Sequence, residues 1–287
     1  MWGDIMTDKK LGKRLIVLGF DGFDYKFLQK LLNEVPWKKF KDYVDICWAN
    51  VRSIRPCKFD SGMLWTTIFS GVHPDIHGVY GYRKAVNGNY DGPPLKYNEL
   101  LPAGYNFVWD AYTDIKWACW QIPIMIPPYE NMSFKHLKSN NDSCVIMEFD
   151  EWKKGVRKVL ETDFDISICV FSGTDQYSHF HWNDFSGMIN LYQQVGIFLD
   201  EIIEKDDNFL ILSDHGFTDI DFAIKQGWTW ANSKIKNGDI GHHAPHGLVI
   251  SDLSPRPFTT LEIVPTIVHW IERKRLLLSG EKDKKKK

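Results

Sequence analysis

The chain has 287 residues, of which 44% are hydrophobic and 25% are charged, and its formal net charge is −2. This length fits one large domain, or one domain with a small insertion, and the hydrophobic content excludes a wholly disordered chain. The balanced charge excludes the strongly basic surface by which many proteins bind nucleic acids, so we expect no specific nucleic-acid partner.

The five cysteines are odd in number and scattered, and no two form a CxxC pair. This pattern argues against a disulfide framework or a structural zinc knuckle and fits a reducing compartment. The one apolar run near the N-terminus is too short and too soon interrupted for a signal peptide or a membrane span. We therefore expect a cytoplasmic protein that does not engage a membrane.

Short β-rich apolar runs alternate with helical patterns along the chain, which is typical of βαβ units around a parallel sheet. We predict an α/β fold with a doubly wound, mostly parallel sheet flanked by helices. The predicted strands are 15–18, 166–171, 209–212 and 248–250, and the predicted helices are 25–32, 151–160, 188–204 and a terminal amphipathic helix that starts at Pro265.

The domain organisation follows from composition. Residues 1–287 read as a single domain, in which the proline-rich stretch 87–141 is the least regular part and predicts a small inserted cap or lid. The lysine-rich residues 280–287 predict a solvated, disordered tail.

Polar side chains with metal-binding chemistry stand where predicted strands end, which is where open α/β sheets place their ligand sites. Asp21 follows the first strand, between glycines that leave room for an ion beside its carboxylate. The alternative is that Asp21 caps the next helix. Asp175 and His179 follow the second strand four residues apart, so a helix would place both on one face to hold a metal or to hydrogen-bond each other. His181, two residues from His179, would point elsewhere.

Two further segments, one after the predicted strand 209–212 and one before the predicted strand 248–250, are richer in histidine. Asp214 and His215 end a fully apolar strand, where burying two polar groups is costly without compensation. The histidines at 242, 243 and 246 precede the last strand, and spacing alone does not say which of them binds. Together the four segments supply ligands for two divalent ions. Nitrogen and oxygen donors suit zinc, with manganese or iron as alternatives, and an ion pair about 4 Å apart suits in-line displacement at phosphorus.

The order of these segments resembles a known family. Asp21, the stretch SGMLWTTIFSGVHPDIHGVYGY, and the runs DQYSH, SDHGF and HAPHG look like the type I phosphodiesterase/nucleotide pyrophosphatase branch of the alkaline-phosphatase superfamily, from about Leu15 to Trp270. The resemblance implies an alkaline-phosphatase-like fold. It also implies a two-metal hydrolase acting on a small phosphate ester, which includes nucleotides.

The resemblance also implies a ligand for each ion. Asp175, His179 and His243 would hold a first metal, near the attacking water and the leaving group. The second metal, which also binds the nucleophile, would be held by Asp21, Asp214 and His215. His243 is preferred over His242 because the family's histidine stands four residues before a glycine, here Gly247.

The implied nucleophile and metal-binding hydroxyl is Ser61, although the proline that relatives often carry two residues later is missing. Its rivals are Thr66, Thr67 and Cys57, and the alternative role for Ser61 is to cap the following helix. His77 is expected to be structural.

The family's phosphate-binding asparagine and a monoesterase arginine are both missing, which leaves Lys58 or backbone N–H groups after Ser61 as candidates. The aromatic residues at 65, 80, 82, 109 and 182 could stack on a nucleobase or fill the core. We expect cleavage of phosphodiester or nucleotide pyrophosphate bonds through a phosphoserine. The alternatives are a phosphomonoesterase, a phosphonate or sulfate ester hydrolase, or a catalytically silent relative.

Overall fold

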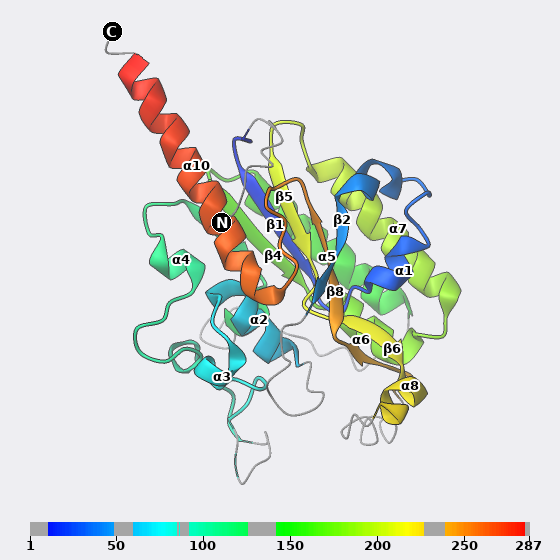
Figure 1. Ribbon diagram of the computed structural model, residues 1–287. Coiled ribbons are helices and arrows are strands. Elements are labelled where there is room, and N and C mark those ends of the chain that lie inside the picture. Colours follow the sequence, from blue (N-terminus) through cyan, green and yellow to red (C-terminus); the bar gives the residue numbers. More distant parts are fainter. Residues whose placement is uncertain are drawn as a thin grey trace.

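The computed structural model describes residues 11–48, 60–84, 86, 92–125, 142–226 and 239–284. A six-stranded sheet in the order β2-β8-β5-β1-β4-β3 lies between two layers of helices (Figure 1). β3, β4, β1 and β5 are parallel, and β8 runs antiparallel to β5 and β2. The strands are β1 (Leu15–Phe20), β2 (Val44–Trp48), β3 (Trp117–Trp120), β4 (Ile166–Phe171), β5 (Asn208–Leu212) and β8 (His246–Ser251). The predicted α/β class with a mostly parallel sheet is confirmed.

A separate two-stranded ribbon pairs β6 (Gly216–Asp219) with β7 (Gly241–Ala244) in antiparallel register. The described helices are α1 (Tyr25–Gln29), α2 (Ser61–Ser70), α3 (Pro74–His77), α4 (Val108–Ala111), α5 (Asp142–Leu160), α6 (Gly173–His181), α7 (Phe185–Ile202), α8 (Ile220–Lys225) and α10 (Ile263–Lys284). Short 3-10 turns cover Trp37–Tyr43, Tyr97–Glu99, Pro123–Met125 and Thr260–Glu262.

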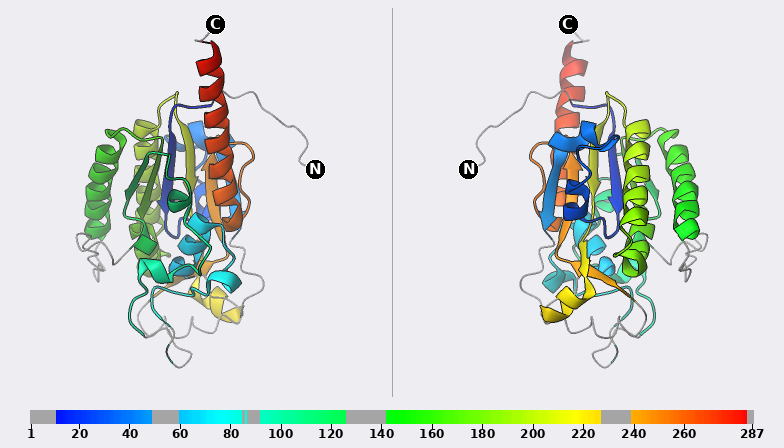
Figure 2. Two further views of the ribbon diagram at one scale, coloured as in Figure 1. Left: turned by 90° about the vertical axis from the view of Figure 1, so that its left-hand side faces the viewer. Right: turned by 90° about the vertical axis from the view of Figure 1, so that its right-hand side faces the viewer.

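The central strand β1 is buried on both faces and joins two hydrophobic cores. Its side chains alternate between the faces of the sheet, as expected for a strand. Ile16 and Leu18 pack in the core beneath α1, α5 and α7, whereas Leu15 and Val17 pack in the core beneath α2 and α10. Figure 2 shows these helix layers on opposite faces of the sheet. The continuous apolar run of β1 reflects this double burial.

The predicted strands and helices are all present, with shifted ends. The terminal helix starts at Ile263, before Pro265, because Thr259 and Glu262 form a capping box that opens the preceding turn. α10 then continues to Lys284, past residue 280, where the sequence predicts the disordered tail to begin. Lysine is a good helix former, and this explains the extension. Residues 285–287 lie outside the described part.

Part of the predicted cap belongs to the sheet. β3 falls within 87–141, yet it pairs in parallel with β4 as the edge strand. Its four residues give too short a pattern to be read as a strand. The other described parts of this stretch contain short helical turns such as α4, and residues 87–91 and 126–141 lie outside the description. The single-domain organisation stays a prediction.

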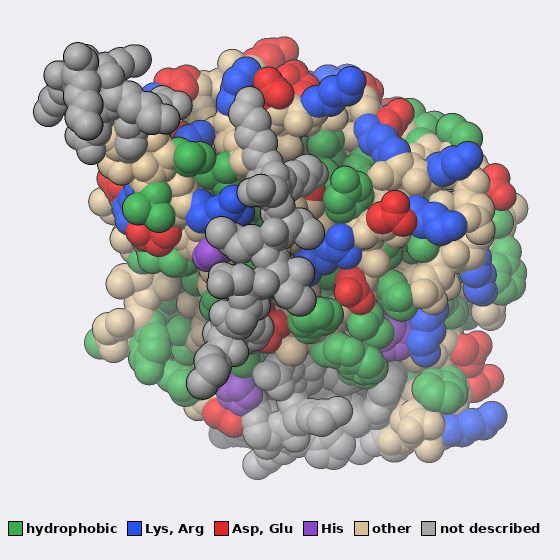
Figure 3. Space-filling view, turned by 45° about the horizontal axis from the view of Figure 1, so that its top comes forward, with side chains coloured by type: hydrophobic (Ala, Val, Ile, Leu, Met, Phe, Trp, Pro, Cys, Tyr) green, Lys and Arg blue, Asp and Glu red, His purple; other side chains and the backbone are tan. Residues whose placement is uncertain are grey.

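None of the helices in the described part of the chain is long and apolar enough to cross a bilayer. On the face shown in Figure 3, acidic and basic side chains are intermixed. That view therefore shows no single-sign patch of the kind that binds nucleic acid.

Candidate active site

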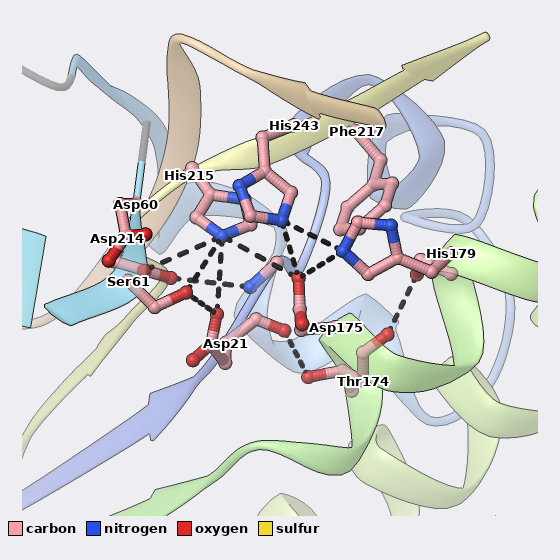
Figure 4. Close-up of polar contacts among 12 residues, drawn as sticks. Asp21, Asp60, Ser61, Thr174, Asp175, His179, Asp214, His215, Phe217 and His243 are labelled. Carbon is pink, nitrogen blue, oxygen red and sulfur yellow. Dashed lines mark hydrogen bonds and ion pairs between the residues drawn. The ribbon is translucent and has the colours of Figure 1, made fainter. Parts of the chain in front are cut away.

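The site forms at the carboxyl ends of three neighbouring parallel strands. Asp21 follows β1, Asp175 lies in the first turn of α6 after β4, and Asp214 and His215 follow β5. Because β4, β1 and β5 are adjacent, these side chains converge at one edge of the sheet, as Figure 4 shows. His243 reaches the same point from β7.

Asp21, Asp214 and His215 form the first of two ligand groups, and one donor atom from each lies within 4.8 Å of the others. His215 Nε2 is 3.2 Å from Asp21 Oδ1 and 3.6 Å from Asp214 Oδ2. The Ser61 hydroxyl donates to Asp21 Oδ1 at 3.0 Å and lies 3.3 Å from His215 Nε2. The structure thus places the predicted nucleophile directly against the group predicted to bind the second metal. We call this the inner group.

Asp175, His215 and His243 form the second set of donors within 4.8 Å. His243 Nε2 is 3.0 Å from Asp175 Oδ1 and 3.0 Å from His179 Nε2. A helix does follow the strand, as predicted. In α6, Asp175 and His179 lie one turn apart on the same face, with His179 Nε2 3.5 Å from Asp175 Oδ1. We call Asp175, His179 and His243 the outer group. His215 lies between the two groups, 3.7 Å from Asp175 Oδ1.

Both groups concentrate negative charge in a buried place. Burial and the neighbouring charge of Asp21 raise the pKa of Asp214 well above its usual value. Burial lowers the pKa of His215, but the charges of Asp214, Asp21 and Asp175 outweigh it and raise that pKa to about 10. Both raised pKa values indicate that the surroundings of Asp214 and His215 favour the binding of a positive charge, either a proton or a cation.

The residues fit divalent cations. Asp175 Oδ1 and Asp214 Oδ2 are buried and accept no hydrogen bond. Among the described residues, the ion pairs of Asp21, Asp175 and Asp214 are with histidines only. Buried carboxylate oxygens are normally hydrogen-bonded or coordinated. Carboxylates and imidazoles that converge in this way can hold two ions, with Ser61 next to one of them.

Surrounding groups fix the direction of these ligands. His179 Nδ1 is 3.3 Å from both Gly241 O and Asp239 Oδ2, and His215 Nδ1 is 3.0 Å from Gly216 O. Each ring therefore turns Nε2 towards the centre, as is usual for metal-binding histidines. The Trp65 indole N–H donates to Asp21 Oδ2 at 3.1 Å, so Trp65 is a buried orienting residue.

Helix capping, the alternative role for Ser61 and for Asp21, falls to other residues. Asp60 is the N-cap of α2 and accepts the Gly62 N–H at 3.0 Å, whereas Ser61 is the first helical residue. Asp24, not Asp21, caps α1 by accepting the Phe27 N–H at 2.7 Å.

The rival nucleophiles Thr66 and Thr67 are buried and donate to carbonyl oxygens one turn earlier in α2. Cys57 and Lys58 lie outside the described residues. Since Gly62 N–H already bonds to Asp60, this predicted backbone donor for phosphate is occupied.

Four other described histidines are not among the donor atoms that converge in these two sets. His181 stacks on Tyr177 with ring centroids 4.4 Å apart, and the buried His242 directs Nδ1 to the His243 carbonyl at 3.1 Å. His246 Nε2 lies 3.6 Å from Asp24. His77 is structural, as expected. Its Nε2 lies 3.0 Å from Thr67 Oγ1, and its Nδ1 accepts the Val79 N–H at 3.0 Å.

Sequence reasoning missed several supporting residues. Asp24 and Asp60 each stand just before a helix, which is the recognisable position of an N-cap. Asp239, beside His179, and Thr174, whose hydroxyl donates to the Asp21 carbonyl, carry no such local signal. Only the folded arrangement brings them to the site.

Comparison with known proteins identifies the family of the chain and similar folds. The type I phosphodiesterase / nucleotide pyrophosphatase family matches residues 15–264. Curated protein sequences give no match. The fold is similar to human ectonucleotide pyrophosphatase / phosphodiesterase 5, with a TM-score of 0.60 and 10% identity, over 90% of this chain and 95% of the other.

A second similar structure is the inactive murine counterpart in complex with AMP, with a TM-score of 0.58 and 10% identity, over 91% of this chain and 95% of the other. At this identity the likeness concerns the fold alone, whereas the family match spans most of the chain. The chain therefore belongs to the type I phosphodiesterase / nucleotide pyrophosphatase family and is a hydrolase.

Proposed function

We propose that this protein is a two-metal hydrolase that cleaves a phosphodiester or nucleotide pyrophosphate bond through a covalent phosphoserine at Ser61. The observation that carries the proposal is the position of the Ser61 hydroxyl, 3.0 Å from Asp21 and 3.3 Å from His215. A nucleophile needs an adjacent group that takes its proton or lowers its pKa. The substrate is proposed to be a small phosphate ester such as a nucleotide.

The two groups would each hold one ion. The inner group would hold the ion next to Ser61, and the outer group would hold the ion near the leaving oxygen. Bound divalent ions would supply a lowered pKa for the Ser61 hydroxyl and for water, and would offset charge on the leaving oxygen. The nitrogen and oxygen donors suit zinc, with manganese or iron as alternatives.

The reaction runs as a double displacement. Ser61 Oγ attacks phosphorus as its proton leaves along the hydrogen bond to Asp21 Oδ1, and the bond from phosphorus to the leaving oxygen breaks. Water then attacks the phosphoserine on the side of the outer group. The bond from phosphorus to Ser61 Oγ breaks, one proton of the attacking water restores the serine hydroxyl, and the proton held by Asp21 passes to the leaving oxygen.

Charge around the nucleophile favours diesters over monoesters. Asp60 adds a carboxylate directly before Ser61, and none of the carboxylates at 21, 175 and 214 pairs with a described lysine or arginine. A phosphomonoester carries up to one more negative charge than a diester at neutral pH, and no described lysine or arginine pairs with these carboxylates and so stands ready to bind that extra charge. We therefore expect bis-p-nitrophenyl phosphate to be cleaved faster than p-nitrophenyl phosphate.

Ser61→Ala tests the proposal. The variant should lose at least about 10²-fold in kcat on bis-p-nitrophenyl phosphate, since it lacks the attacking oxygen. It should keep most of its metal, because the six Asp and His donors remain. Thr67→Ala, which removes a buried hydroxyl from the same helix, is the matched control and should keep activity. Full turnover in Ser61→Ala would exclude the covalent route.

A further inference from the structure

A cavity of about 590 Å³ lies beside the metal-binding groups and is not used by the mechanism above. None of the predicted metal ligands, nor Ser61, is among its described lining residues. Its size is that of a pocket for a small organic ligand. The walls come from α1, the junction of α6 and α7, α8, the β6–β7 ribbon and the ends of β2 and β8.

Aromatic rings dominate the wall. Phe185, Phe222 and Trp48 line the cavity, yet 59%, 50% and 46% of their surfaces are exposed. The rings of Phe27 and Phe185 are stacked, with their centroids 6.4 Å apart and an angle of 16° between their planes. Half-exposed aromatic rings that surround one cavity mark a place where an aromatic group can be buried between them, because aromatic pairs gain energy beyond the area that they bury.

The wall of the cavity also contains a buried polar side chain. His246 lines the cavity, is 93% buried, and has an Nε2 that makes no hydrogen bond. The nearest acidic oxygen, on Asp24, is 3.6 Å away, which is beyond hydrogen-bond length. The Nζ atom of Lys30 lies over the Phe185 ring, 5.6 Å from the ring centroid. The cavity therefore combines apolar ring faces with a few polar groups, as ligand sites do.

The cavity shares one wall with the outer group. Phe217 lines it, and the Phe217 ring packs against His179 and His243 with centroids 5.1 and 5.4 Å away. Figure 4 shows Phe217 beside His179. Ala244, the residue after His243, lines the cavity too. The cavity thus adjoins the outer group, which is the side on which the proposed function places the leaving oxygen.

We propose that this cavity binds the leaving group of the substrate and selects one that carries a planar aromatic ring. The proposal rests on the proposed function for the leaving-group side, but the cavity and its aromatic specificity do not depend on turnover. Rings of the ligand would stack against Phe185 and Phe222.

The test uses naphthol, the aromatic leaving group of a naphthyl phosphodiester. Its fluorescence anisotropy is titrated with protein that has been treated with a chelator, so that binding is read without metal or catalysis. Phe185→Ala and Phe222→Ala should each weaken naphthol binding about tenfold, the loss of one aromatic contact. Tyr105→Ala is the matched control, since Tyr105 is 44% exposed and lies outside the described lining. It should bind naphthol as the unchanged protein does.

Kinetics with metal-loaded protein complete the test. Naphthol should inhibit hydrolysis of bis-p-nitrophenyl phosphate by occupying the leaving-group side of the free enzyme and of the phosphoserine form, and the inhibition constant should rise about tenfold in Phe185→Ala. Equal binding of naphthol to all variants would overturn the cavity assignment, and an inhibition constant that does not change in Phe185→Ala would overturn its leaving-group role. If naphthol binding depends on Phe185 but no ester is cleaved, the proposed function fails while the aromatic site stands.

Discussion

The inner and outer groups hold similar ligands in different surroundings. In the inner group, Asp214 and His215 are fully buried and come directly after a central strand. In the outer group, Asp175 has 18% of its side chain exposed, and His179 and His243 each have 9%. The inner group is therefore fixed by the sheet itself, next to the proposed nucleophile Ser61. The outer group stands at the rim, where water and a leaving group can reach it.

The difference in burial suits two different tasks. The buried inner group suits the positioning of a nucleophile, and the partly exposed outer group suits the entry and exit of small molecules. A nucleophile must be held close to its reaction geometry, which the ends of buried strands provide. An oxygen that departs and a water that arrives need an opening. The aromatic cavity adjoins the rim group and not the buried one, in keeping with this division.

The largest effect is expected from breaking the inner group. Asp214→Asn should lower kcat/KM on bis-p-nitrophenyl phosphate by at least about 10²-fold, because it removes a charged ligand next to the nucleophile. The metal-free variant should be more stable than the metal-free parent at neutral pH. Burial raises the pKa of Asp214, so its ionisation opposes folding increasingly as pH rises. Chemical denaturation in the presence of a chelator measures this, and a destabilised metal-free Asp214→Asn would contradict it.

A smaller effect is expected from loosening the outer group. Asp239→Asn removes the charge 3.3 Å from His179 Nδ1 but leaves every predicted ligand in place. Loss of such a supporting carboxylate costs about 10- to 100-fold in metal affinity. Metal titration should show this loss for one of two sites. Equal weakening of both sites would argue that the two groups do not act separately.

The smallest effect, on stability alone, is expected outside both groups, in the short helix α3 that follows α2. Burial lowers the pKa of His77 from 6.5 to about 4, so the native protein resists protonation that the unfolded chain accepts. This contribution is complete above pH 6.5 and is lost as pH falls towards 4. His77→Ala should cost about 1–2 kcal/mol at neutral pH through two lost hydrogen bonds. Its stability should also change less between pH 6.5 and 4, as followed by denaturation at several pH values.

The sequence predicts the ligands well where they end a long apolar strand. Asp21, Asp214 and His215 follow β1 and β5, whose uninterrupted apolar runs identify strands buried on both faces. It predicts poorly where a short segment gains its structure from a distant partner. β3 and β7 have four residues each and form only by pairing with β4 and β6.

The same limit applies within the site. The sequence predicts Asp175 and His179 from a helical spacing of four residues, and the helix forms as expected. It does not predict Asp239, because the approach of Asp239 to His179 depends on tertiary contacts of the segment before β7. The predicted helix begins at residue 25, as α1 does, so Asp24 and not Asp21 already stands at the N-cap position.

β1 links both cores to the site, and this restricts how the chain can vary in length. Since its side chains alternate between the two cores, one inserted residue would exchange the sets that face α7 and α10. It would also shift Asp21 by about 3.3 Å relative to Asp214. Insertions and deletions within Leu15–Phe20 should therefore abolish both folding and activity.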